Sequence, residues 1–347
     1  MLTLAAWAAA EGALFHSGWY NKYIEPDSSA GQVEYHLFWL RRTPAPKVPD
    51  VLVVGDSRIA EGFSSLTAQS AIGNKLHFTN FGMPGSYPRV WYYTIRDADP
   101  QRNRFAAIVL ALGQYSDQDR EAPPQRVISD LSYLAGRLRL SDCGEFARSY
   151  EDYEAGRQAL TGCILRGVVL RPDILSFLGN IRKRLAHAKD WRNNGDGYIA
   201  GYGGKPEDVI GLSADWTART VHYPPGLDET RTGSIKYTVM PEPSPQTGDE
   251  TRYRTQWLGG IVDLYKNSAT RIVFMELPRA PLPVPEAATP PRFIDAVSRR
   301  PQVAVLPEGT FRDLERPDVF ADGMHLNHVG RPIFSQRLAE RVSAILP

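Results

Sequence analysis

Continuous apolar runs alternate along this chain with stretches of helical spacing. The apolar runs, rich in valine, isoleucine and leucine, predict buried strands near 50–55, 105–112, 270–277 and 303–306, and a short strand is expected near 76–81. Helical spacing follows at 58–72, 87–97, 125–190, 258–266 and 326–345. Strands that alternate with helices favour an α/β fold in which a central parallel sheet is covered on both sides.

The same pattern predicts how the chain is divided. Residues 1–49 form an apolar segment and an aromatic-rich, irregular lead-in that ends in a proline-rich stretch. Residues 50–347 are expected to form one domain with an insertion at about 126–256. Within the insertion, 190–256 is rich in glycine and proline, and a structureless loop of that length is uncommon. We expect either a lid-like subdomain or a partly ordered region there, whose aromatic residues form a sugar platform or a small core of their own.

The N-terminal run, residues 1–15, is apolar but shorter than the roughly 20 residues that a spanning helix needs. Glu11 interrupts it, and no basic region precedes it as in a secretory signal. The run is either the tail of a membrane anchor or a helix packed on the domain. Apolar residues surround the helix up to position 10 without forming one stripe, which favours the anchor.

Charge and cysteine content exclude several classes of protein. Forty basic and 39 acidic residues leave a net charge of +1, which lacks the basic excess of a nucleic-acid binder. A hydrophobic content of 42% is enough for a large core. Two cysteines, Cys143 and Cys163, exclude a cysteine-rich zinc site and a disulfide scaffold. They pair if the protein is exported, and otherwise act as small buried apolar residues.

The end of the first strand carries the first candidate chemistry. Residues 51–54 run directly into Gly55, Asp56 and Ser57, and a helix begins there. Ligands of open α/β sheets bind at the carboxyl ends of the strands, and free N–H groups at a helix N-terminus favour a developing anion. Ser57 is therefore a candidate nucleophile. The alternative is that Asp56 and Ser57 only cap the helix.

A second candidate lies near the C-terminus, where Asp322 precedes His325 by three residues. That spacing lets the carboxylate reach Nδ1 of the imidazole, leaving Nε2 to take a proton from a serine. The alternative is a surface turn with an Asp cap. Adding His328 gives a spacing of i, i+3 and i+6, but the outer two residues then diverge by about 120° on a helix. We therefore predict no metal site.

Together these motifs resemble those of the SGNH/GDSL hydrolase superfamily. Gly55-Asp56-Ser57 matches its first block, and Asp322-Gly-Met-His325 matches its last block, about 265 residues later. Residues 80–85 resemble the second block, in which Gly85 matches the glycine that donates to the oxyanion hole. Residues 113–116 stand where the third block belongs, but Tyr115 replaces its asparagine. The resemblance covers about 50–125 and 268–347.

The resemblance implies a three-layer α/β/α, flavodoxin-like fold and acyl-enzyme chemistry without metal or organic cofactor. Ser57 would attack an ester carbonyl, His325 would act as base and then acid, and Asp322 would orient His325. The N–H groups of Ser57 and Gly85 would bind the oxyanion. Because alternation places Gln114 and Tyr115 on opposite sides of the strand end, only one of them can be the third donor. We predict Gln114, whose amide is the closer substitute for asparagine.

The function implied is a serine-dependent esterase that acts on acyl, in particular acetyl, esters of carbohydrate. The first alternative is an O-acyltransferase that modifies a cell-surface polysaccharide. The second is a catalytically weak SGNH-like module that binds glycans, which the altered third block favours. Related envelope proteins imply an exported or periplasmic location with membrane attachment through the N-terminal segment, while a cytoplasmic location stays open. The expected partner is a small-molecule or carbohydrate ester, with no nucleic acid.

Overall fold

The computed structural model describes residues 2–113, 115, 125–194, 202–241, 251–284 and 293–346. The chain forms two compact units. A helical unit contains 1–44, 86–100 and 120–197, and a sheet unit contains 45–85, 101–119 and 198–347. These units group the chain differently from the domains expected from the sequence, because parts of the expected insertion belong to each unit. The expected domain boundaries stay a prediction.

The sheet unit is built on five parallel strands, in the order β2-β1-β3-β6-β7. They are β1 (Asp50–Gly55), β2 (His77–Gly82), β3 (Ala107–Leu112), β6 (Arg271–Glu276) and β7 (Val303–Val305). Every residue of β1 and β3 is buried, which explains why both strands read as continuous apolar runs in the sequence. The predicted α/β class with a central parallel sheet is confirmed.

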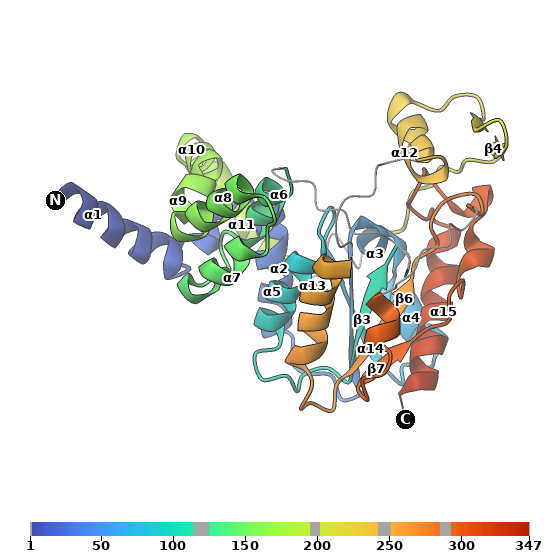
Figure 1. The fold of residues 1–347 in the computed structure, drawn as a ribbon, viewed down its shortest axis with the longest axis horizontal. Helices are drawn as coiled ribbons and strands as arrows, with labels where there is room; N and C mark the ends of the chain where they lie inside the picture. The colour runs from blue at the N-terminus through green and yellow to red at the C-terminus, as the bar shows by residue number, and fades with distance from the viewer. Residues whose placement is uncertain are drawn as a thin grey trace. The chain divides into compact units, whose positions relative to one another are not determined.

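Helices cover both faces of this sheet. On one face, α3 (Ser57–Gly62) and α4 (Ser65–Ala71) pack against β2 and against the C-terminal helix α15 (Gly330–Ile345). Figure 1 shows α13 (Thr251–Leu264), with α14 (Phe293–Val297) beside it, on the opposite face from α15. The arrangement is consistent with the three-layer α/β/α fold. Short 3-10 turns, Arg312–Leu314 and Pro317–Val319, precede α15.

The strand order reverses direction at β1. From β1 the chain passes to β2 on one side, and later continues to β3 on the other side. Such a reversal of strand order is where open α/β sheets bind ligands, at the carboxyl ends of the strands. Ser57 begins α3 two residues after the end of β1, and therefore lies at this position.

Part of the glycine- and proline-rich region is ordered in the sheet unit. Its described residues, 202–241, include a small hairpin of β4 (Ser213–Asp215) and β5 (Thr220–His222), followed by α12 (Glu229–Val239). On α12, Ile235 and Val239 are buried in the core cluster of the sheet unit. The segment is therefore anchored to the sheet unit by apolar packing.

The helical unit consists of short helices. They are α1 (Leu2–Glu11), α2 (Ser29–Arg42), α5 (Pro88–Ala98), α6 (Gln125–Leu134), α7 (Cys143–Arg148), α8 (Tyr153–Ile164), α9 (Arg166–Val169), α10 (Arg171–Gly179) and α11 (Ile181–Asn193), with turns at Gly12–His16, Tyr20–Tyr23 and Leu140–Asp142. A disulfide joins Cys143 of α7 to Cys163 of α8. Of the two interpretations of these cysteines, the structure contains the paired one.

The lead-in was predicted to be irregular, and this prediction is wrong where α2 forms. The Ser28 side chain accepts a hydrogen bond from the Gly31 amide and so caps the helix. Val33, Leu37 and Leu40 are buried at helical spacing. The scattered aromatic residues of this stretch concealed that period in the sequence.

At the N-terminus, α1 ends at Glu11, whose carboxylate accepts hydrogen bonds from the Gly167 amide. No helix among the residues that the structure describes has the length and apolar character needed to cross a bilayer.

Candidate active site

Ser57, His325 and Asp322 form a chain of hydrogen bonds in the sheet unit. His325 Nε2 lies 2.8 Å from Ser57 Oγ, although the two residues are 268 positions apart. On the other side of the ring, Nδ1 lies 2.9 Å from Asp322 Oδ2. Because an ionised carboxylate can only accept, Nδ1 carries the imidazole proton and Nε2 accepts from the serine hydroxyl. The structure thus brings together the three residues in the order that proton transfer from serine needs.

The loop itself holds Asp322 in place. Its Oδ1 accepts hydrogen bonds from the backbone amides of Met324 and His325, each at 2.9 Å. Burial acts to raise the pKa of Asp322, but the hydrogen bond and charge of His325, with the two amides, outweigh it and lower the pKa to about 2. The carboxylate is therefore ionised at neutral pH and can stabilise an imidazolium on His325.

The helix-cap interpretation of this region holds for Asp56. Its Oδ1 accepts from the Arg58 amide at 2.9 Å, and its Oδ2 pairs with Arg58 Nη2 at 2.8 Å. Burial acts to raise the pKa of Asp56, but the charge and hydrogen bonds of Arg58 lower it. The neighbouring Ser57 hydroxyl instead faces His325. Asp56 therefore fixes the start of α3, and Ser57 stays a candidate nucleophile.

Contacts with β2 hold α3 in place. The buried Asn80 amide donates to the carbonyls of Ile59 and Phe63 at 3.0 and 2.9 Å, and its Oδ1 accepts from the Gly82 amide at 2.9 Å. A Cβ at Gly82 would lie only 2.2 Å from the backbone nitrogen of Ala60, so only glycine lets α3 approach β2 this closely. These contacts hold the helix that carries Ser57 against the sheet.

Gly85 lies at the same edge of the sheet as Ser57. Gly55 of β1 and Gly82 of β2 are paired in register, and Gly85 follows β2 by three residues. Its backbone is in the left-handed region, with φ of +74°. The strand register therefore places both candidate backbone donors, Ser57 and Gly85, at adjacent strand ends.

The third candidate donor, Gln114, lies outside the described residues. Its alternative, Tyr115, is described and is turned away from the candidate site. The Tyr115 hydroxyl is buried 2.9 Å from the carbonyl oxygen of Phe274 and 2.8 Å from that of Leu306. Burial and the charge of Glu276 raise its pKa above the ordinary value. Tyr115 is therefore a core hydrogen-bond donor, and Gln114 stays the predicted third oxyanion donor.

The different roles assigned to Gln114 and Tyr115 predict two separate effects of substitution. Gln114→Ala should lower kcat/KM by about 10²–10³-fold, the usual cost of losing one oxyanion donor. Tyr115→Phe should leave kcat/KM within about threefold but lower the free energy of unfolding by about 1–2 kcal/mol, because it removes the buried hydroxyl that donates to the Phe274 and Leu306 carbonyls. Ester kinetics and urea denaturation of both variants measure these effects. A large kinetic loss in Tyr115→Phe alone would reverse the assignment.

Two residues near the candidate site were missed in the sequence. Lys205 Nζ lies 2.9 Å from Glu61 Oε2 and 3.6 Å from Asp322 Oδ2. Glu61 is four residues after Ser57 on α3, and this spacing is a signal that the two share a helix face. Lys205 has no such signal, because only the tertiary fold brings it to the loop that carries Asp322 and His325.

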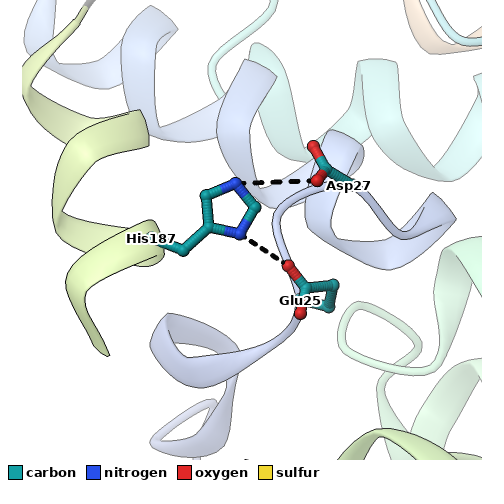
Figure 2. Close-up of side chains that lie close together, drawn as sticks. All are labelled: Glu25, Asp27 and His187. Carbon is teal, nitrogen blue, oxygen red and sulfur yellow. Dashed lines mark hydrogen bonds and ion pairs between the residues drawn. The ribbon is translucent and has the colours of Figure 1, made fainter. Parts of the chain in front are cut away.

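The helical unit holds a separate cluster of Glu25, Asp27 and His187 (Figure 2). Figure 2 shows the carboxylates at different nitrogens of the ring, with Glu25 Oε1 2.8 Å from Nδ1 and Asp27 Oδ2 3.6 Å from Nε2. The Trp191 indole also donates to Nε2, at 3.0 Å. Each of the three residues offers one ligand atom, and these atoms lie within 4.8 Å of one another, a spacing that a metal ion could also bridge. The hydrogen bond of His187 to Glu25 and its ion pair with Asp27 link α11 to the segment before α2.

The aromatic residues expected to form a sugar platform are divided between the units. Trp191 packs on Tyr35 in the helical unit, where both line a crevice of about 830 Å³. Tyr202 lies by Glu61 in the sheet unit, and Tyr237 on α12 is 73% exposed. Tyr198 lies outside the described residues. The described aromatic residues of this stretch therefore belong to both units, and the sugar platform stays a prediction.

Comparison with known proteins gives no relative from which a role can be transferred. Neither the protein-family models nor the curated proteins contain a match to this chain. The geometry of Ser57, His325 and Asp322 and the motif resemblance are therefore the basis for a functional proposal.

Proposed function

We propose that this protein is a serine-dependent ester hydrolase of the SGNH/GDSL type that acts on acyl esters of carbohydrate. The observation that carries the proposal is the chain from Ser57 through His325 to Asp322, with contacts of 2.8 and 2.9 Å. Ser57 and the pair of Asp322 and His325 come from distant parts of the sequence, and they form this chain of contacts at the carboxyl end of β1. The bond pattern matches the requirements of nucleophilic acyl transfer.

In the first half of the reaction, Ser57 Oγ attacks the ester carbonyl while its proton passes to His325 Nε2. A bond forms between Oγ and the carbonyl carbon, and the carbonyl oxygen becomes an oxyanion. The imidazolium is stabilised by the Asp322 carboxylate at Nδ1, which is ionised because its pKa is lowered to about 2. Collapse of the intermediate breaks the bond to the alcohol, which leaves with the proton from His325.

In the second half, water attacks the acyl-enzyme. His325 takes a proton from water as the new bond forms, and returns it to Ser57 Oγ as the acyl bond breaks. The products are a carboxylic acid and the free serine. In both halves the amides of Ser57 and Gly85, with the Gln114 side chain, would bind the oxyanion.

The substrate class and location are also part of this proposal. Carbohydrate esters and an exported location follow from the motif resemblance. The disulfide between Cys143 and Cys163 supports export, because disulfides persist mainly in oxidising compartments. The N-terminal attachment to a membrane stays part of the same proposal.

The identity of the acceptor is tested by following both products of one reaction. The full chain is incubated with an acetyl ester donor, with and without neutral and acidic oligosaccharides, and free acetate and acetylated sugar are measured together. We expect acetate release that no oligosaccharide diverts, because water is the acceptor in the proposed reaction. Ser57→Ala serves as the blank for spontaneous hydrolysis.

Two other results would overturn the proposed hydrolase. Acetylated sugar that forms at the expense of acetate would identify an O-acyltransferase. Saturable sugar binding without any acyl transfer, even from an activated ester, would identify a glycan-binding module.

A further inference from the structure

Lys205 connects the two elements that carry the candidate catalytic residues. Its ammonium lies 2.9 Å from Glu61 Oε2 and 3.6 Å from Asp322 Oδ2. Glu61 lies on α3, one helical turn after Ser57, and Asp322 lies on the loop that carries His325. The Glu61 and Asp322 side chains are 16% and 15% exposed and Lys205 is 37% exposed, so water screens the two carboxylates less than surface groups but reaches the ammonium.

The backbone fixes Lys205 at this position. The Lys205 carbonyl accepts a hydrogen bond from the His328 amide at 2.8 Å, and Lys205 forms a parallel bridge with Asn327. The lysine is therefore attached to the catalytic loop through its own main chain. Its side chain extends from this fixed backbone to the carboxylates of Glu61 and Asp322. Lys205 is therefore held both at its main chain and at its ammonium.

Other charged groups near the loop of Asp322 and His325 have different partners. Asp56 at the start of α3 pairs with Arg58. Arg231 of α12 donates to the carbonyls of Ala321 and Asp208.

The remaining polar neighbours lie around Glu61 and the loop. The Tyr202 hydroxyl is 3.4 Å from Glu61 Oε2, and the Arg331 guanidinium faces the Tyr202 ring. The His328 ring lies against the Lys205 carbonyl. Among the described lysine and arginine residues, Lys205 is the one whose side chain lies within ion-pair distance of the Asp322 carboxylate.

We infer that Lys205 is a positioning residue that sets the net charge felt by the Asp322–His325 pair, with Glu61 as its counter-charge. The inference deepens the proposed function, since it concerns how the catalytic base of that site is tuned. The positive charge of Lys205 disfavours an imidazolium on His325, and the negative charge of Glu61 offsets part of this effect. Burial acts to lower the pKa of Lys205, but its contacts with Glu61 and Asp322 raise it, so the ammonium stays charged.

Removing either charge should move the pKa of His325, and the two removals should move it in opposite directions. In Lys205→Met the cation is lost and Glu61 is left unpaired, so the pKa of His325 should rise by about 0.5–1 pH unit. In Glu61→Gln the lysine is no longer neutralised, so the pKa of His325 should fall by a similar amount. The double variant should lie near the parent, as should Lys205→Arg, which keeps the charge.

NMR titration of histidine-labelled full-length protein measures these shifts directly, with His325→Gln used to assign the signal among the seven histidines. The acid limb of kcat/KM should move in step with the titration, because His325 acts as a base only when it is neutral. A merely structural role would lower the melting temperature of both single variants without opposite shifts of the pKa. Unchanged or same-direction shifts would therefore overturn the inference.

The titration also separates this inference from the proposed function. If no ester is hydrolysed but the opposite shifts are observed, the role of Lys205 stands and the proposed hydrolase fails. If esters are hydrolysed through Ser57 but the pKa of His325 does not respond, the hydrolase stands and the role of Lys205 fails.

Discussion

Ser57→Ala is expected to abolish ester hydrolysis and labelling by a fluorophosphonate, with a loss in kcat of about 10⁴–10⁶-fold. The reason is that Ser57 Oγ is the atom placed 2.8 Å from the base, and alanine offers no nucleophile. Labelling of the parent protein followed by mass spectrometry should place the adduct on the peptide that contains Ser57. Any residual rate in the variant would come from oxyanion binding alone.

An exposed serine on the following helix gives a matched control. Ser70 of α4 is outside the hydrogen-bonded chain, so Ser70→Ala should keep both labelling and turnover. Equal labelling of parent and Ser57→Ala, or an adduct on another residue, would refute the assignment of the nucleophile. Melting temperatures of the variants show whether any loss comes from misfolding.

His325→Ala should cause a similar loss of turnover, whereas His328→Ala should keep most of the activity. The two histidines are three residues apart and their side chains have different partners. His325 contacts both Ser57 and Asp322, while the exposed His328 ring lies 3.2 Å from the Lys205 carbonyl. Without His325 no group accepts the Ser57 proton, so kcat should fall by about 10³–10⁶-fold.

Steady-state kinetics on one activated ester measures both variants under the same conditions. His328→Ala is a fair comparison because the His328 amide, which bonds to Lys205, is retained in the variant. If His328→Ala were inactive and His325→Ala active, His328 would be identified as the general base, and Asp322 would lose its proposed role. Equal, modest losses in both would indicate that neither residue is the base.

Much of the sheet could be predicted because the burial of each strand leaves a pattern within a short stretch of the sequence. The runs around β1 and β3 are buried on both faces, so each reads as an uninterrupted series of apolar residues. The site at the end of β1 was predictable for a related reason. Gly55 and Ser57 stand where a strand gives way to a helix, and strand ends in parallel sheets meet at one edge.

Residues whose role depends on tertiary contacts were not predictable. Lys205 lies in a glycine-rich stretch without a helical or strand pattern of apolar residues. Its contact with Asp322 exists only because the chain returns to the loop that carries Asp322 and His325. Tyr115 was misleading in the opposite way, because its position in the sequence suggested a place in the candidate active site. The alternation rule allowed one donor there, and the structure turns the Tyr115 hydroxyl toward Phe274 in the core.

The close approach of α12 to the catalytic loop has a consequence for engineering this protein. A Cβ at Gly323 would lie 2.3 Å from the Ser234 carbonyl oxygen, and the Arg231 side chain holds the Ala321 carbonyl at 2.9 Å. The backbone on either side of Asp322 thus uses α12 as part of its support. Residues 202–241 therefore cannot be exchanged as an interchangeable specificity loop. A graft from another protein would have to reproduce the Ser234 backbone path and the Arg231 anchor, or Asp322 would no longer be held in line with His325.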